Sequence, residues 1–157
     1  MFHVRPLALG AAVALCACLP ILAVAQEHET SADPLVIETA DGQFDYTVEL
    51  ALDGRERAIG LMNRESMEDD HGMLFRFESV RPVSMWMKNT LIPLDMLFIR
   101  EDGTVAGFHE NAEPMSETVI SAPEPIRYVL ELNGGTAEEI GLAEGDRVSH
   151  PVIDGTD

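Results

Sequence analysis

Basic residues are scarce in this chain of 157 residues. It has 10 Lys and Arg residues against 28 Asp and Glu residues, which gives a formal net charge of −18, and Lys88 is its sole lysine. A nucleic-acid-binding surface needs clustered Lys and Arg side chains to neutralise phosphates. The composition therefore argues against a nucleic acid as the partner.

The common catalytic motifs are also missing. The sequence has no G-x-S-x-G nucleophile elbow, no H-E-x-x-H metal pair and no glycine-rich phosphate loop. These motifs place a nucleophile, a zinc ion or a phosphate group in many hydrolases and nucleotide enzymes. Their absence lowers the expectation of such activities, and we expect neither a metal nor another cofactor.

The first 25 residues have the three parts of a secretory signal peptide. Residues 1–5 form a short basic start, residues 6–24 are almost wholly apolar, and residues 23–25 (Ala-Val-Ala) match a signal-peptidase site. We therefore predict cleavage before Gln26 and a periplasmic or secreted protein without stable membrane insertion. A retained helical anchor is one alternative, because the apolar run nearly spans a bilayer. A lipid anchor at residues 15–18 (Leu-Cys-Ala-Cys) is another.

Both cysteines, Cys16 and Cys18, lie inside this segment, so cleavage would leave a chain without cysteine. A structural disulfide and a catalytic thiolate are then excluded. The remaining length and an apolar content of 46% predict one domain with a core of its own. The predicted organisation is a signal peptide at 1–25, a flexible lead-in at 26–34, a compact β domain at 35–150 and a loose tail at 151–157.

Alternation of apolar and polar residues predicts strands along most of the domain. The alternation is strict at 44–52, and the nearly continuous apolar run at 94–99 is typical of a strand covered on both faces. Further strands are expected at 35–39, 73–78, 83–88, 104–108, 127–132 and 147–149.

Two short helices are predicted from capping boxes. Asp53 with Glu56 would begin a helix at Gly54 that runs to about Met62, and Thr136 with Glu139 would begin a second one that ends at Gly141. Many short strands with Gly, Pro and Asp turns indicate a mainly β fold, a jelly-roll-like sandwich or barrel.

Several blocks of sequence together resemble a known family. They are Gly60–Arg64 (GLMNR), Gly72–Phe75 (GMLF), Trp86–Ile99 (WMKNTLIPLDMLFI), Arg127–Gly135 (RYVLELNGG) and Gly145–Val148 (GDRV). From about Phe44 to Val148 the chain is similar to domain-of-unknown-function family 192. The resemblance implies a compact, mostly β domain of jelly-roll type, often exported. It implies no established reaction.

Four groups of residues are candidates for function. Asp95 lies among apolar neighbours, where a carboxylate is costly unless it is paired or hydrogen-bonded. It is therefore either a functional acid or a structural acceptor for backbone N–H groups. Trp86, Lys88 and Asn89 put an aromatic plane beside a cation and an amide, which suits a sugar or a carboxylated ligand, although Trp86 can equally be a core residue.

His109 and Glu131 complete a possible acid–base set with Asp95. His109 can act as a general base oriented by a carboxylate, or it is an ordinary edge histidine. Met85 and Met87 point to one side of the predicted strand, where thioethers can bind Cu(I). Methionine is also a common filler of core gaps.

These candidates support four hypotheses. The first is a binding module for a small polar or carbohydrate-like ligand, held by Trp86, Lys88, Asn89 and Asp95 under the loop at 113–125. The second is a carboxylate-based hydrolase that uses Asp95, Glu131 and His109, which must then share one cleft. The third is a copper protein, which needs the methionines on one exposed face. The fourth is a structural or partner-binding domain of the cell envelope.

Overall fold

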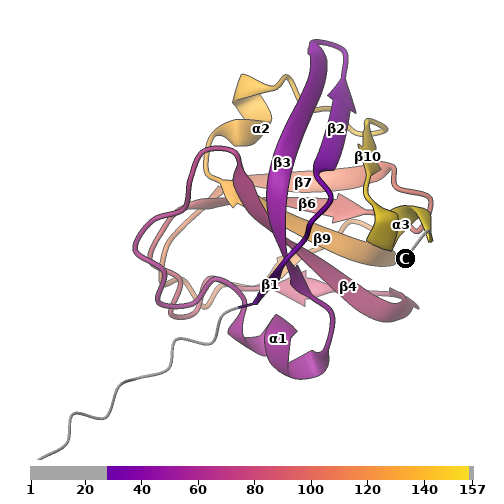
Figure 1. The fold of residues 1–157 in the computed structure, drawn as a ribbon. Coiled ribbons are helices and arrows are strands. Elements are labelled where there is room, and N and C mark those ends of the chain that lie inside the picture. Colours follow the sequence, from indigo (N-terminus) through magenta and orange to yellow (C-terminus); the bar gives the residue numbers. More distant parts are fainter. Residues whose placement is uncertain (1–27, 156–157) are drawn as a thin grey trace, which may run out of the picture.

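A computed structural model describes residues 28–155 of the chain (Figure 1). The predicted signal peptide lies outside the described residues. The strands are β1 (Glu29–Thr30), β2 (Leu35–Thr39), β3 (Gly42–Ala51), β4 (His71–Arg81), β5 (Ser84–Met85), β6 (Leu94–Ile99), β7 (Val105–Ala112), β8 (Ile120–Ser121), β9 (Ile126–Asn133) and β10 (Arg147–Ser149). The helices are α1 (Gly54–Ile59), α2 (Thr136–Glu139) and α3 (Pro151–Asp154).

One large sheet forms the body of the molecule. Its strand order is β10-β2-β3-β4-β9-β6-β7, with β1 added beside β3, while β5 and β8 pair separately. Every pair in the sheet is antiparallel except β3 and β4, which are parallel and joined through α1. A bridge between Thr104 and Arg147 brings the two ends of the strand order together. The sheet is thus a curled, partly closed barrel, and the mainly β, single-domain prediction is confirmed.

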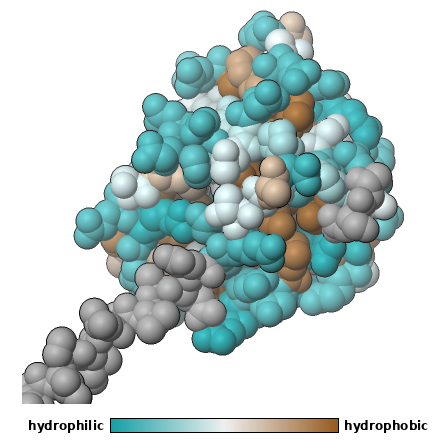
Figure 2. All heavy atoms as spheres, viewed as in Figure 1, coloured by the Kyte–Doolittle hydropathy of each residue, from teal (hydrophilic) through white to brown (hydrophobic). Residues whose placement is uncertain are grey.

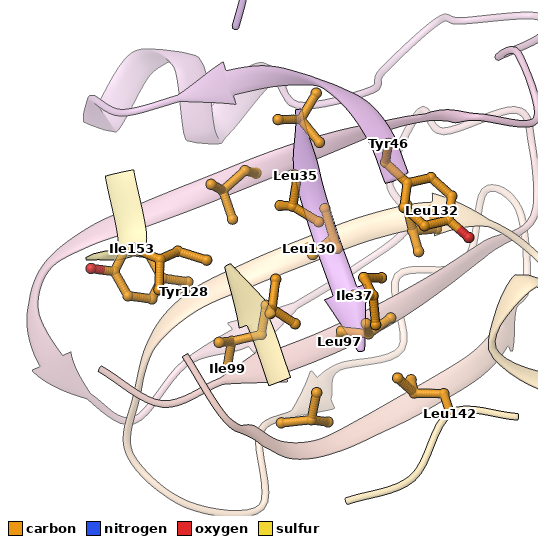
Figure 3. Packing of buried hydrophobic residues seen from close by; sticks show 14 of the residues in the cluster. Leu35, Ile37, Tyr46, Leu97, Ile99, Tyr128, Leu130, Leu132, Leu142 and Ile153 are labelled. Atoms are coloured by element: carbon orange, nitrogen blue, oxygen red, sulfur yellow. The ribbon is translucent and has the colours of Figure 1, made fainter. Parts of the chain in front are cut away.

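The first core lies on one face of the sheet. Its side chains come from β2, β6 and β9 and point into the same space, as Leu35, Leu97 and Leu130 do in Figure 3. Residues of α2, α3 and β10 close this core from the side, and Val152 and Ile153 belong to it. The apolar positions of the period-two pattern in β3, including Tyr46 and Val48, face this core, as the alternation predicts.

A second core covers the opposite face of β4, β6 and β9. Met73, Phe75, Met96 and Phe98 project from these strands, and segments that are remote in sequence cover them, among them Leu61, Val83 and Met87. Because both faces are covered, every residue of β6 is buried, which confirms the prediction for 94–99. This second layer of loops over the sheet creates the pocket described below.

The predicted cap of α1 is confirmed. The Asp53 carboxylate accepts hydrogen bonds from the backbone N–H groups of Arg55 and Glu56, and the Glu56 side chain accepts one from the N–H of Asp53. The helix ends at Ile59, earlier than predicted, because Gly60 leaves the helical region with φ 47° and ψ −137°. Glycine tolerates this backbone conformation because it has no Cβ.

Several local predictions were wrong. Thr136 does not cap α2: the cap residue is Gly135 in the left-handed region, with no side-chain cap hydrogen bond. The strand expected at 83–88 is only the two-residue β5. Part of the predicted lead-in forms β1, and part of the predicted loose tail forms α3, whose N-cap His150 accepts the N–H of Val152 through Nδ1.

The face of the molecule in Figure 2 is mostly hydrophilic, with small apolar areas between polar side chains. This agrees with the excess of acidic residues. Within residues 28–155, no helix is long and apolar enough to cross a membrane.

Candidate functional site

A pocket of about 240 Å³ lies between α1, the β5 region and the second face of the sheet. Its walls include the apolar side chains of Leu61, Phe75, Phe77 and Trp86 beside several polar groups. It is somewhat smaller than the sites that hold drug-sized ligands, which start at roughly 300 Å³. The pocket therefore suits a compact molecule with an apolar body.

The carboxyl group of Glu131 is the exceptional polar group of this pocket. Glu131 lies in the middle of β9, is only 4% exposed and lines the pocket. Its neighbours across the sheet are Met73 on β4 and Met96 on β6, both fully buried. No hydrogen bond or ion pair joins its carboxyl to any other residue in the range 28–155. Burial alone raises the pKa of Glu131 to about 8, because the ionised form loses its hydration.

The local backbone around Gly60 gives the pocket its shape. A Cβ atom at Gly60 would lie 3.2 Å from the Phe75 ring, so the missing side chain lets the chain turn tightly over that ring. Leu61 then enters the second core at 2% exposure. The opposite wall includes Thr90, which is buried and whose backbone carbonyl accepts the N–H of Met115.

Trp86 is the one predicted ligand residue that reaches this pocket. Its side chain is 48% exposed and lines the pocket, which argues against a core role. The Lys88 Nζ atom lies 5.3 Å from the centroid of the Trp86 ring, so the predicted proximity of the two is confirmed. Lys88 also lies 4.0 Å from a carboxylate oxygen of Glu117. It does not line the pocket.

Asn89 shapes a loop and does not reach the pocket. It has a positive φ of 56°, a conformation that asparagine tolerates better than most residues. Its backbone carbonyl accepts the N–H of Asn63, and its side-chain amide contacts the sulfur of Met62 at 3.8 Å. These contacts tie the two loops that flank the pocket.

Asp95 is a structural acceptor. Its fully buried carboxylate accepts hydrogen bonds from the backbone N–H groups of Asn111 at 2.7 Å, Gly135 at 3.1 Å and Ala137 at 2.7 Å. It therefore joins the end of β7 to the start of α2. A carboxylate with three such donors is well satisfied in the interior. Its partners lie later in the chain, with Asn111 on β7 and with Gly135 and Ala137 at the start of α2.

The structure does not bring Asp95, Glu131 and His109 into one cleft. Met96 pairs with Glu131, so Asp95, the residue before Met96, points to the opposite face of the sheet. His109 is exposed on β7 and lines a separate, open groove of about 550 Å³ beneath the loop at 113–125. The convergence that a two-carboxylate hydrolase requires is absent for these three residues.

The methionines of the copper hypothesis lie in the second core. Met87 is 1% exposed, and Met85 packs against the same cluster from its edge. They do not form the exposed thioether face that the hypothesis needs. Their placement agrees with core packing.

Sequence reasoning missed the pocket because its walls come from four separate parts of the chain. Leu61, Phe75, Phe77 and Thr90 line it together with Trp86 and Glu131, but none of the first four was a candidate. A signal was present: Gly60–Arg64, Gly72–Phe75 and the start of Trp86–Ile99 are blocks that carry the family resemblance. Their meeting point could not be found from the sequence alone.

The fold and the pocket define a small, single-domain β protein with a pocket of about 240 Å³ between a curled sheet and the segments that cover it. The chain belongs to the DUF192 family, whose model matches residues 36–150 and is described as "Uncharacterized ACR, COG1430".

Two solved structures are similar. One comes from Sinorhizobium meliloti 1021 and is described as a "putative transcription regulator". It is 52% identical in sequence with a TM-score of 0.75, and the match covers 78% of this chain and 96% of that one. The other is a protein of unknown function from Novosphingobium aromaticivorans DSM 12444, with 34% identity, a TM-score of 0.76, and coverage of 90% and 99%. No curated protein matches the chain.

Proposed function

We propose that this protein is an exported binding module of the cell envelope that holds a small molecule in the pocket of Glu131, Thr90 and Trp86. The observation that carries this proposal is the unpartnered carboxyl of Glu131, which is 4% exposed and lines a cavity. Buried polar groups normally have hydrogen-bond partners, so an exception needs an explanation. A bound ligand supplies the missing partner.

The chemistry of the walls narrows the ligand class. A sugar presents many hydroxyl groups, whereas four polar side chains line this pocket, those of Arg57, Ser84, Thr90 and Glu131. Arg57 already donates to Glu78 and to two backbone carbonyls. The site therefore fits a compact ligand with an apolar body and one polar group better than it fits a carbohydrate. The location of the site differs from the predicted set, because Lys88, Asn89 and Asp95 do not take part in the lining.

A thermal-shift screen of the purified mature chain, residues 26–157, tests the proposal. The panel contains small neutral, anionic and cationic compounds and monosaccharides. A ligand at 100 times its dissociation constant stabilises the folded state by about 2.7 kcal/mol. Because Trp86 is the single tryptophan and lines the pocket, a change in its fluorescence locates the ligand.

A rim-blocking variant provides the control. Ala58 is exposed on α1 and lines the pocket, so Ala58→Phe should obstruct the entrance without disturbing the core. Ala143→Phe, at an exposed position elsewhere, is the matched variant. We expect the first to abolish a hit and the second to keep it. A hit that survives Ala58→Phe, or a panel without a hit, would refute the proposed site.

Export is part of the same proposal. It is supported by the signal-like residues 1–25 and by a family match that begins only at residue 36. Expression in a bacterial host followed by mass spectrometry of the envelope fraction should give a chain that starts at Gln26. Full-length protein in the cytoplasm would contradict it.

A protein-partner role is the second candidate. Four large apolar side chains, Trp86, Leu91, Met115 and Val119, are exposed in the segments that cover the second core. If the screen finds no ligand, crosslinking in the native envelope is the next experiment. A role in transcription, the description given to the relative from Sinorhizobium meliloti, is not carried over, because 10 basic residues against 28 acidic ones do not favour DNA.

A further inference from the structure

We infer that the ligand is a small protonated amine, whose ammonium group pairs with the carboxylate of Glu131 while its apolar body contacts the aromatic walls. The inference rests on the proposed function and names its ligand class. It follows from the charges at the pocket, from the aromatic rings that line it and from the charge of the whole chain.

The cations near the pocket already have partners, whereas the carboxyl group of Glu131 has none among residues 28–155. Arg57 lines the pocket, and its guanidinium lies 2.7 Å from the carboxylate of Glu78. Lys88, at the rim beside Trp86, lies 4.0 Å from the carboxylate of Glu117. Glu131 is the only titratable group of the lining that lacks a partner within the described part of the chain. A cationic ligand completes this charge arrangement, and an anionic one would leave Glu131 unpaired.

The aromatic lining attracts cations already. The Arg57 guanidinium carbon lies 5.3 Å from the centroid of the Phe77 ring, and Lys88 lies at the same distance from that of Trp86. Such distances allow a cation to interact with the negative face of the ring. Phe75, which is 1% exposed, adds a third ring to the same walls. An ammonium group with a short apolar or aromatic body matches both the rings and the carboxylate.

The charge of the whole protein acts in the same direction. A formal net charge of −18 creates a negative potential around the molecule, which raises the local concentration of cations and lowers that of anions. The volume of about 240 Å³ sets an upper limit on the ligand. Small monoamines fit this limit, and polymers do not.

Binding of an amine must displace a proton from Glu131. With a pKa of about 8, roughly nine in ten Glu131 side chains are protonated at pH 7. The ammonium ion forms its ion pair with the carboxylate, and the proton leaves to the solvent. Other elements that pack around Glu131 contribute Met73 and Met96, which do not titrate, and Arg57, whose guanidinium pairs with the carboxylate of Glu78.

One histidine, His109, lies in the same part of the sheet. It lies on β7, in register with Met96, so a fully buried methionine separates it from Glu131. It lines a different groove. A His109→Gln variant therefore serves as the control for any contribution of this side chain to the pH dependence of binding.

Benzylamine and benzyl alcohol are the matched probes, with phenylacetate as the anionic counterpart. Titration calorimetry in two buffers of different ionisation enthalpy counts the protons released, and Trp86 fluorescence confirms the location. We expect at least tenfold tighter binding of benzylamine than of benzyl alcohol at pH 8, and release of about 0.9 proton at pH 7. The affinity for benzylamine should rise about 50-fold from pH 6 to pH 8.

Three variants complete the test. Glu131→Gln keeps the volume of the side chain but cannot become an anion. It should therefore weaken the binding of benzylamine at least tenfold and remove the pH dependence of that binding. Glu110→Gln, at an exposed position on β7, should bind like the natural chain, and so should His109→Gln. Equal binding of benzyl alcohol without proton release would overturn the amine inference and leave the proposed function intact. Absence of binding by every compound of the panel would overturn both.

Discussion

Replacing Glu131 with Gln should make the protein more stable at neutral and alkaline pH. In the folded state the pKa of Glu131 is about 8 because the carboxyl is buried, whereas its ordinary value is 4.5. Below pH 4.5 both the folded and the unfolded chain hold the proton. Between pH 4.5 and 8 the unfolded chain has released a proton that the folded chain retains, so the free energy of unfolding falls as the pH rises.

The size of this effect follows from the two pKa values. Each tenfold difference in proton affinity is equivalent to about 1.4 kcal/mol, so the loss is about 3 kcal/mol at pH 7 and approaches about 5 kcal/mol above pH 9. A glutamine of the same shape does not ionise and avoids this loss. It is also able to donate a hydrogen bond into the pocket, as the protonated carboxyl is.

Urea-induced unfolding at pH 5, 7 and 9 measures the effect. Other carboxyl groups change the curve of the natural chain in the opposite direction; the pKa of Asp102, for example, is lowered, first by the hydroxyl of Thr104. The difference between the natural chain and Glu131→Gln cancels these contributions. We expect the difference to be about 0.8 kcal/mol at pH 5 and to grow with pH, while Glu110→Gln follows the natural chain. Parallel curves for the natural chain and Glu131→Gln would refute the burial argument.

Three further predictions concern other parts of the structure. Asp95→Asn replaces the charged acceptor of three backbone N–H groups with an amide that cannot satisfy all of them. Urea unfolding at pH 7 should show that the free energy of unfolding falls by about 2–4 kcal/mol. A fall below about 0.5 kcal/mol would contradict the structural role of Asp95. Gly60→Ala places a side chain on a residue with positive φ and brings its Cβ against the Phe75 ring. The same assay should show that the free energy of unfolding falls by about 1–3 kcal/mol. An unchanged urea midpoint would show that the turn is free to adjust. Lys88→Gln should change the free energy of unfolding by less than about 0.5 kcal/mol, because the pair with Glu117 is solvent-exposed. A larger change in the urea midpoint or the melting temperature would reveal a stronger contact than the 4.0 Å distance implies.

Local patterns determined the parts of the fold that could be predicted. The period-two alternation at 44–52 and the apolar run at 94–99 became β3 and β6, and the Asp53 capping box formed as expected. These features depend on neighbouring residues along the chain, so the sequence contains what is needed to find them. The second capping box failed because Asp95, 41 residues earlier than Thr136, is the acceptor for N–H groups at the start of α2.

The site depended on packing between remote segments. The alternation in β9 puts Glu131 on the side opposite Leu130 and Leu132, which in an ordinary two-layer fold would be the solvent side. It is buried because loops far away in the chain form a second layer over that face. No local sequence pattern predicts such a layer. The sequence therefore identified Glu131 as a candidate carboxyl group but could not show that it lines a pocket with Trp86.

The bridge between Thr104 and Arg147 has a consequence for aggregation. Open sheets expose unpaired N–H and C=O groups along their outer strands, and these groups recruit strands of other chains. Here the backbone of Val105 bonds with that of Asp146 at 2.9 Å, and the N–H of Val148 bonds with the carbonyl of Gly103 at 2.8 Å. The outer strands β7 and β10 therefore protect each other at this end of the sheet. We expect strand-to-strand association to begin, under destabilising conditions, only after this junction has opened.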